Sequence, residues 1–219
     1  GQILLYILLG ISAVYCSIAL QKCKFALAYF FANLQKNMNF VKILIIIKIY
    51  NQVKSILGIG NALTDILAVL EDDSLLREYH IPRGSMQHVD METGDKIWQN
   101  LKKMDLQYVA GGSAANTITA TAVLGMPSTF IGKIGEDELG ALFKSDLSRN
   151  GIKSTLFKGR AASGRAMVFI TAPNAERTFA VYLGAAIEMG PDELTIEMFK
   201  GHDYFHIEGY LVQNQKLVR

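Results

Sequence analysis

The sequence predicts an α/β domain over residues 55–219, and three stretches carry this prediction. Residues 55–60 (SILGIG) form a short apolar run that ends in glycine, a pattern typical of a buried first strand. Residues 106–125 combine an apolar segment, a glycine pair and a helical stretch. Residues 128–150 repeat the order of strand and helix that is found in βαβ units.

Charge is divided unevenly along the chain. Residues 1–54 contain six of the 22 basic residues, all of them lysines, and none of the 20 acidic residues. Residues 55–219 therefore carry 16 basic and 20 acidic side chains. The predicted domain has no general electrostatic attraction for nucleic acid, so we expect no nucleic-acid partner.

Cysteine usage gives a second constraint on the predicted domain. Both cysteines of the chain, Cys16 and Cys23, precede it. Residues 55–219 can therefore form neither a disulfide nor a metal site with thiolate ligands. A reducing, cytoplasmic location fits this composition.

The apolar, basic segment 1–54 has two interpretations. Residues 3–20 are mainly apolar and are followed by Lys22 and Lys24, which is near the lower length limit of a membrane-spanning helix. These lysines would favour a cytoplasmic location for the domain that follows. The segment also lacks acidic residues and proline, and its first methionine is Met38, so it could instead be a non-native translation of sequence upstream of the true start. We expect a membrane partner only if residues 3–20 are an authentic anchor.

Two polar residues, Asn61 and Asp65, follow the first predicted strand. A dinucleotide-binding fingerprint is excluded because Leu63 occupies the place of its third glycine. Open α/β sheets bind ligands beyond the carboxyl ends of their strands, where a carboxylate can accept hydrogen bonds from two neighbouring hydroxyls. The pair therefore indicates a polyol or sugar ligand. The alternative is that these side chains cap a helix or a turn.

The next stretch of the chain is more polar. It predicts helices over residues 73–79 and 93–103, with a turn at 82–84 between them. His80 and His88 stand alone in the sequence, so we expect them at exposed loop positions and not as metal ligands.

The glycine pair Gly111–Gly112 ends the apolar segment 106–110, which we expect to be a strand. Ser113 then caps a helix that runs to Leu124. A strand, two glycines and a helix N-terminus bring bare backbone close to a ligand and direct N–H groups at it. The alternative is a tight turn with a helix of small residues packed behind it.

The remaining elements alternate between helices and β-rich runs. Acidic residues at 136–138 open a helix that ends near Gly151, an interpretation that fits their spacing better than a calcium loop. His202 and His206 are four residues apart, and a strand would separate them too far to share a metal ion. The predicted segments are strands at 128–134, 154–157, 165–171, 177–182 and 203–207, a hairpin turn at 173–176, and an amphipathic helix at 191–199.

Taken together, the sequence resembles the ribokinase-like (PfkB) family of carbohydrate and nucleoside kinases, and within it the adenosine kinase-like branch. The resemblance covers the chain from about residue 55 to residue 219. Its most informative feature is a double-glycine motif paired with a downstream GxxGxDxxG-like stretch at the expected distance. The matching stretches are GIGNALTDI (58–66), RGSMQHVD (83–90), GGSAAN (111–116), GKIGEDELG (132–140), AERTF (175–179), YLGAA (182–186) and HIEGYLV (206–212).

The resemblance implies a doubly wound α/β core, incomplete at the C-terminus, with a small β-sheet lid over the acceptor. The lid strands are expected around residues 66–70, 83–90, 106–110 and 153–170. Closure of a lid would keep water from competing as phosphoryl acceptor. The implied reaction is phosphorylation of a primary hydroxyl of a sugar or nucleoside, with ATP and Mg²⁺ in the full-length enzyme. Lid edges often pair in relatives, which implies a homodimer through the lid.

The resemblance also implies roles for individual residues. Asp65 matches the aspartate that holds sugar hydroxyls. Arg177 matches a hairpin arginine that lies near the transferred phosphate. The residues that match the clamp around the sugar are Gly111, Gly112 and Asn116, with Asn61 nearby.

One family signature is missing from the sequence. The family's DTxGAGD-type loop stabilises phosphate charge, and its aspartate takes the proton from the attacking hydroxyl. No GAGD occurs among the 219 residues, so no catalytic base and no metal ligand can be assigned. We expect residues 55–219 to be the acceptor-binding half of a kinase, inactive alone. The alternative is a non-catalytic fragment that binds a sugar or nucleoside, or that associates with a partner.

Overall fold

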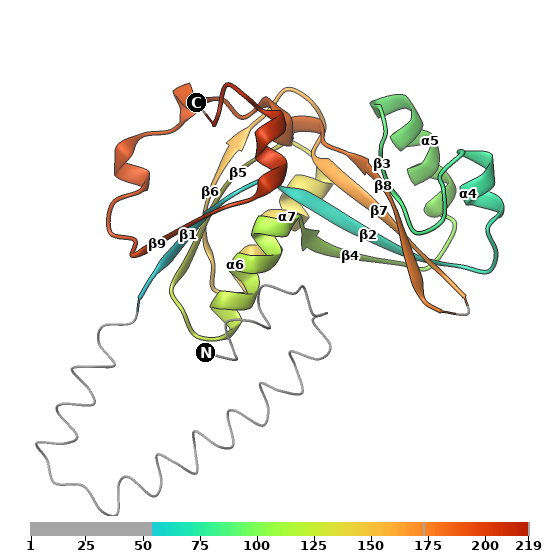
Figure 1. The fold of residues 1–219 in the computed structure, drawn as a ribbon, viewed down its shortest axis with the longest axis horizontal. Helices are drawn as coiled ribbons and strands as arrows, with labels where there is room; N and C mark the ends of the chain where they lie inside the picture. The colour runs from blue at the N-terminus through green and yellow to red at the C-terminus, as the bar shows by residue number, and fades with distance from the viewer. Residues whose placement is uncertain (1–53, 173, 219) are drawn as a thin grey trace, which may run out of the picture. The chain divides into compact units, whose positions relative to one another are not determined.

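The first of two sheets is parallel and follows from the apolar runs of the sequence (Figure 1). Its strand order is β6-β5-β1-β9, so the run at 55–60 forms a strand with neighbours on both sides. The strands are β1 (Ile56–Ile59), β5 (Ser128–Ile134), β6 (Lys153–Lys158) and β9 (Tyr204–Ile207). We call this sheet, with the segments packed on it, the core.

The computed structural model describes residues 54–172 and 174–218. The predicted anchor at residues 3–20 lies outside these ranges. Within them, none of the helices combines the length and the apolar character that crossing a membrane requires.

One face of the core sheet is covered by α6 (Ser113–Val123) and α7 (Glu138–Arg149). Ile118 of α6 lies against Gly58 of β1, where an added Cβ would be 2.3 Å from Ile118 Cγ1. Phe143 of α7 packs on Phe130 of β5 with ring centroids 5.7 Å apart. Helix α7 begins where the acidic residues predict it, because Asp137 accepts a hydrogen bond from the N–H of Gly140.

The other face of the core sheet is covered by the C-terminal segment, and here the predicted helix at 191–199 is wrong. The segment forms two 3₁₀ turns, η2 (Pro191–Glu193) and η3 (Ile196–Met198). Leu194 and Thr195 between them are extended. The apolar residues of this stretch still reach the sheet, since Leu194, Met198 and Phe199 pack against the buried side chains of β1 and β5.

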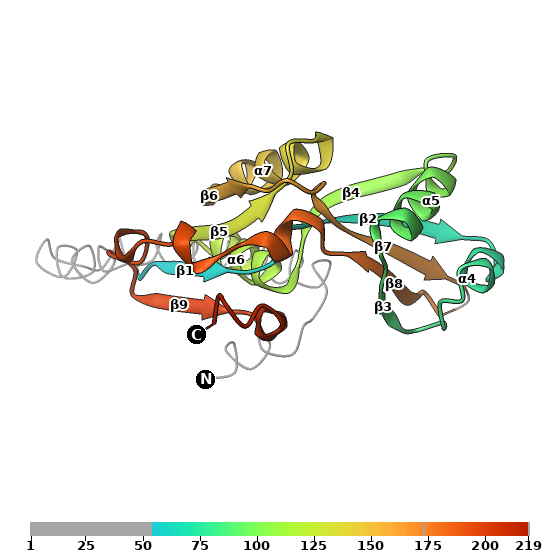
Figure 2. The ribbon, with the colours of Figure 1, turned by 90° about the horizontal axis from the view of Figure 1, so that it is seen from above.

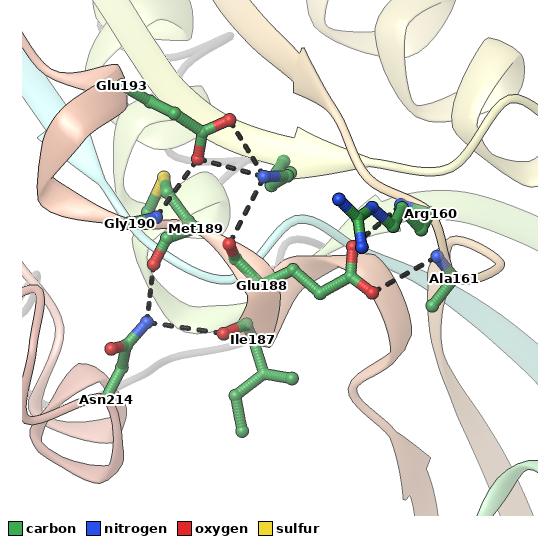
Figure 3. A network of polar contacts seen from close by, with 9 residues as sticks. Arg160, Ala161, Ile187, Glu188, Met189, Gly190, Glu193 and Asn214 are labelled. Carbon is green, nitrogen blue, oxygen red and sulfur yellow. Dashed lines mark hydrogen bonds and ion pairs between the residues drawn. The ribbon is translucent and has the colours of Figure 1, made fainter.

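Hydrogen bonds hold this C-terminal segment against the core (Figure 3). The buried Lys133 of β5 donates to both carboxylate oxygens of Glu193, at 2.8 and 2.9 Å. Glu188 closes η1 (Gly184–Glu188) and accepts from the N–H groups of Arg160 and Ala161. Asn214 donates to the carbonyl of Met189 at 2.6 Å. These contacts hold the chain in place directly after it leaves the second sheet.

The second sheet is mixed, with strand order β3-β8-β7-β2-β4. Helices α4 (Ser74–Glu78) and α5 (Met91–Leu101) cover one of its faces, and Figure 2 shows them at the end away from the core strands. We call this sheet with its two helices the lid. Its strands are β2 (Leu63–Leu70), β3 (Met86–His88), β4 (Leu106–Gly111), β7 (Gly164–Thr171) and β8 (Glu176–Tyr182).

The expected lid strands at 66–70, 83–90 and 106–110 agree with this sheet, but the expectation for 153–170 is wrong in part. Residues 153–158 form β6, which pairs in parallel with β5 and so belongs to the core. Within residues 153–170 the chain passes from the core sheet to the lid sheet after β6. Strand β8, which was predicted as the second arm of a hairpin, joins the lid by antiparallel pairing with β7.

The change of sheets after β6 is held by Ser163. Its N–H and hydroxyl both donate to Asp137, at 2.7 and 2.6 Å, and its hydroxyl accepts from the N–H of Gly135. Burial by itself would raise the pKa of Asp137, but the hydrogen bonds from Ser163 and Gly140 lower that pKa overall. The stretch GKIGEDELG therefore joins the start of α7 to the first residues of the lid strand β7.

A buried arginine fastens α5 to the lid sheet. Arg165 of β7 is 1% exposed and forms an ion pair with Asp95 of α5. Its guanidinium carbon lies 4.9 Å from the ring centroid of Trp98 and 5.1 Å from that of Tyr182. Two aromatic faces and a carboxylate thus replace part of the water that this cation loses on burial, while its buried Nε has no hydrogen-bond partner among the described residues.

Leu147→Ala tests the packing of α7 on the core sheet. Leu147 is 0% exposed, so truncation leaves a cavity, and we expect the free energy of unfolding to fall by about 2–5 kcal/mol in urea titrations. Leu124→Ala is the matched control, because Leu124 is 48% exposed and its loss should cost less than about 1 kcal/mol. Equal costs for the two substitutions would contradict this packing.

Candidate functional site

A cavity of about 380 Å³ lies where the core and the lid meet. Four of the predicted site residues line it: Asn61 after β1, Asp65 in β2, Gly112 before α6, and Asn116 in α6. They come from two parts of the sequence, residues 61–65 and 112–116. The cavity has the size of common small-molecule sites.

The fifth predicted residue, Gly111, makes room for Asp65. A Cβ at Gly111 would lie 2.0 Å from Asp65 Oδ1 and 2.5 Å from Oδ2, so a larger residue at this end of β4 would displace the carboxylate. Strand pairing explains the proximity, because Leu63 of β2 is opposite Gly111 and Asp65 is two residues further along. The carboxylate therefore rests against bare backbone.

Gly112 makes room for Asn61 in the same way. A Cβ at Gly112 would lie 2.4 Å from the carbonyl oxygen of Asn61, and its φ of +91° also favours glycine. Gly112 is the N-cap residue of α6, so the prediction that Ser113 caps this helix is wrong. The reason is that the Ser113 hydroxyl donates to a residue of the C-terminal segment.

That residue is Glu208, a buried carboxylate that the sequence analysis did not single out. Its Oε1 accepts from the backbone N–H and the side-chain amide of Asn61, each at 2.7 Å. Its Oε2 accepts from the Ser113 hydroxyl at 2.7 Å and from the N–H of Ala114 at 3.0 Å. Glu208 lies directly after β9, as Asn61 lies just beyond β1, and this shared position was the signal that could have identified it.

The hydrogen bonds to Glu208 define what Asn61 can offer a ligand. Since the amide nitrogen of Asn61 donates to Glu208, its amide oxygen is the group that can accept a hydrogen bond from a hydroxyl. Asn116, on the exposed side of α6, keeps both an amide donor and an amide acceptor at the cavity.

Asp65 has an unusual electrostatic environment. Burial raises the pKa of its carboxyl group to about 6, and the positive charge of Arg177 opposes this rise. Its carboxylate has no hydrogen-bond partner among residues 54–172 and 174–218. A partly buried acceptor without a donor is a group that a ligand hydroxyl can satisfy.

Arg177 lies outside the lining of this cavity. It is exposed on β8, two residues before Phe179, and its guanidinium carbon is 5.9 Å from the Phe179 ring centroid. Its charge acts on Asp65, but a position near a transferred phosphate stays a prediction.

The expected lid supplies a second wall of the cavity, from residues that the sequence analysis did not assign to the site. Met86 and His88 of β3 and Phe179 and Val181 of β8 all line the cavity. His88 is exposed as predicted, but it lies on a strand and not in a loop. No cluster of three or more His, Cys, Asp or Glu side chains that could hold a metal ion occurs in the part of the chain that the structure describes.

Comparison with known proteins finds relatives among carbohydrate kinases. A family model described as pfkB family carbohydrate kinase matches residues 87–217. Fructokinase from Solanum tuberosum is 32% identical over 99 residues, which are 44% of this chain and 31% of that protein. Fructokinase-1 from Zea mays is 34% identical over 100 residues, again 44% of this chain and 31% of the relative.

Solved structures show the same fold. Adenosine kinase from Sinorhizobium meliloti superposes with a TM-score of 0.66 at 30% identity, over 76% of this chain and 50% of that one. A probable sugar kinase from Rhizobium etli gives 0.66 at 28% identity, over 76% and 51%.

These matches confirm the α/β fold with a parallel sheet and a mixed sheet. The chain spans about a third of the length of the curated relatives and about half the length of the solved structures. Because the family model covers more than half of its residues, this chain belongs to the pfkB family of carbohydrate kinases.

Proposed function

We propose that residues 55–219 bind the phosphoryl acceptor of an ATP-dependent kinase, a sugar or nucleoside that is phosphorylated at a primary hydroxyl. Family membership supports the reaction class. The observation that carries the acceptor site is Asp65, a carboxylate that faces the cavity, has a raised pKa and lacks a hydrogen-bond donor among the described residues.

Each polar group of the cavity has a role in this proposal. The two oxygens of Asp65 accept hydrogen bonds from neighbouring hydroxyls of the acceptor. The amide groups of Asn61 and Asn116 bind further hydroxyls, and the absence of side chains at Gly111 and Gly112 lets the sugar ring approach the backbone. The lid restricts access of water, which would otherwise compete for the phosphoryl group.

The proposal assigns no catalytic base and no nucleotide site to these residues. The family implies ATP and Mg²⁺, whose charges would stabilise the transferred phosphoryl group. The described residues do not fit such a metal site, since they contain no cluster of three candidate ligands. Arg177 is the one predicted residue that we propose for the phosphate side of the acceptor.

A second candidate function is an association module without catalysis. Strand β9 forms one edge of the core sheet, and Phe205 and Ile207 on it are 51% and 48% exposed. Val109 on the lid edge strand β4 is 42% exposed, so pairing of two lids is a further candidate contact. Calorimetric titration with candidate acceptors separates the two functions: binding of a sugar or nucleoside supports the acceptor-binding half of a kinase, and self-association without such binding supports the module.

Asp65→Asn tests the acceptor site directly. The substitution keeps the shape of the side chain but replaces a charged acceptor, so we expect the affinity for the acceptor to fall at least tenfold in calorimetric titrations. Asp105→Asn is the control, because Asp105 is exposed and lies outside the cavity lining. Unchanged affinity in Asp65→Asn would refute the proposed role.

The raised pKa of Asp65 predicts a pH dependence. The carboxylate is the form that accepts hydrogen bonds from hydroxyls, and burial keeps the group protonated below about pH 6. Acceptor affinity should therefore be about tenfold weaker at about pH 5 than at about pH 7.5. The unliganded protein should also lose stability, relative to Asp65→Asn, as the pH rises through about 6, because a buried group must then ionise. A pH profile identical in both proteins would contradict this assignment.

Glu208→Gln tests the carboxylate that positions Asn61 and Ser113. The new amide places an NH₂ group against two donors, so we expect a loss of roughly 1–3 kcal/mol in the free energy of unfolding in urea. Acceptor affinity should fall as well, measured where the variant is folded. Glu71→Gln is the control, since Glu71 is exposed, and it should change stability by less than about 0.5 kcal/mol. Equal stability of the two variants would show that Glu208 is dispensable.

A further inference from the structure

We propose that Asp146 of α7 is a positioning residue for the acceptor site, because its carboxylate holds the end of β4 against Asp65. This inference rests on the proposed function, since it assigns a role in the same site to a residue outside the cavity lining. Asp146 belongs to the core and β4 to the lid, so the contact joins the two. Its basis is a set of hydrogen bonds between α7 and the strands that surround Asp65.

The contact is a hydrogen bond from the backbone of β4 to the side chain of Asp146. The N–H of Ala110 donates to Asp146 Oδ2 at 2.8 Å. Strand β4 lies at the edge of the lid sheet, so its outward N–H groups face no further strand in the described part of the chain. The carboxylate therefore takes the place of a neighbouring strand for one N–H group. Because this acceptor is charged, the bond is stronger than one to a neutral oxygen.

The packing of α7 fixes the direction of this carboxylate. Leu147, the next residue, is buried in the core, which sets the rotation of the helix about its own axis. The side chain of Asp146 is 18% exposed, and its other oxygen, Oδ1, lies 3.3 Å from the guanidinium of Arg149. Each oxygen of Asp146 thus has one partner, and Oδ2 is directed at β4.

Ala110 lies where its backbone affects Asp65. It is opposite Thr64 in the pairing of β4 with β2, and Thr64 directly precedes Asp65. Ala110 also directly precedes Gly111, whose backbone lies against the Asp65 carboxylate. A shift of this end of β4 would change the surface on which the carboxylate rests, and small displacements of a binding group are costly. Asp146 therefore controls that surface without reaching the cavity.

Helix α7 also holds the two other strands beside the acceptor carboxylate. The buried hydroxyl of Thr64 in β2 donates to the carbonyl of Leu139 at 3.1 Å. Ser163, directly before β7, donates to Asp137 at the start of α7. Strands β2, β4 and β7 are thus each attached to one core helix at a residue beside the site. The contact of Asp146 can be removed alone, since Asp137 also caps α7 and Thr64 is buried in the sheet.

Asp146→Ala tests the positioning role, and Asp146→Asn is the conservative variant. Alanine favours the helix and removes the acceptor, whereas the amide oxygen of asparagine can still accept from the N–H of Ala110. Calorimetric titrations of the 219-residue chain use adenosine and D-fructose as probes. For each probe that the unsubstituted chain binds, we expect Asp146→Ala to weaken binding roughly tenfold and Asp146→Asn by less than about threefold. Ser145→Ala, an exposed neighbour on α7, is the matched control and should leave binding unchanged.

Two further measurements distinguish positioning from a general loss of stability. Amide hydrogen exchange of the unliganded chain should be faster over residues 106–111 in Asp146→Ala than in Asp146→Asn, with the rest of the lid unchanged. In the Asp65→Asn background, Asp146→Ala should weaken binding by less than about twofold, because its effect passes through Asp65. Faster exchange throughout the lid, or losses of affinity that simply multiply, would overturn the proposal.

The outcomes separate this inference from the proposed function. If Asp65→Asn weakens acceptor binding and Asp146→Ala does not, the acceptor site stands and the positioning role is overturned. An unfolded Asp146→Ala beside a folded Ser145→Ala, measured by circular dichroism, would show that the contact maintains the fold and would also overturn that role. If neither probe binds, or if Asp65→Asn binds both unchanged, the proposed function fails together with the inference.

Discussion

The geometry of the candidate site depends on the carboxylate of Glu208. A buried carboxylate is tolerated only when its lone pairs are occupied, and two N–H groups, an amide and a hydroxyl occupy them here. Its charge also lies at the amino end of α6, where the helix dipole stabilises it. Glu208 thus joins the ends of β1 and β9 to the start of α6. Asn61 and Ser113, which it holds, line the cavity, so the site is already ordered without a ligand.

The space beside the glycine pair 111–112 is a second constraint on the geometry of the site, because neighbouring polar groups fill it. Each glycine of the pair 111–112 makes room for a different polar residue, Gly111 for the Asp65 carboxylate and Gly112 for the Asn61 carbonyl. The same contacts place the end of the lid strand β4 against β2 and the start of α6 against the core. A substitution at either glycine would therefore disturb the binding groups and the junction of the two sheets together.

The sequence predicted most of the strands and four polar or glycine residues of the cavity, because both depend on local patterns. These residues are Asn61, Asp65, Gly112 and Asn116. Apolar runs marked β1 and β5, and Asn61 directly follows the glycine that ends the first run. The failures all involve partners distant in the chain. Strand β6 could be assigned to the core only from its pairing with β5, and the 3₁₀ turns around Leu194 depend on the sheet face beneath them. The prediction that Ser113 caps α6 fails because its hydroxyl donates to Glu208, which is 95 residues away in the chain.

Arg165 has a mechanical consequence for the cavity. It occupies β7 directly before Ala166, and the two side chains point to opposite faces of the sheet, one into the contact with α5 and the other into the cavity. Arg165 is buried and Asp95 is half-exposed, and their ion pair, with the packing of Arg165 on Trp98 and Tyr182, holds α5 against the sheet. Any movement of the lid relative to the core must then be absorbed by the short stretches where the chain passes between the two sheets. The lid wall of the cavity is thus supported on its opposite face by α5, which does not line the cavity.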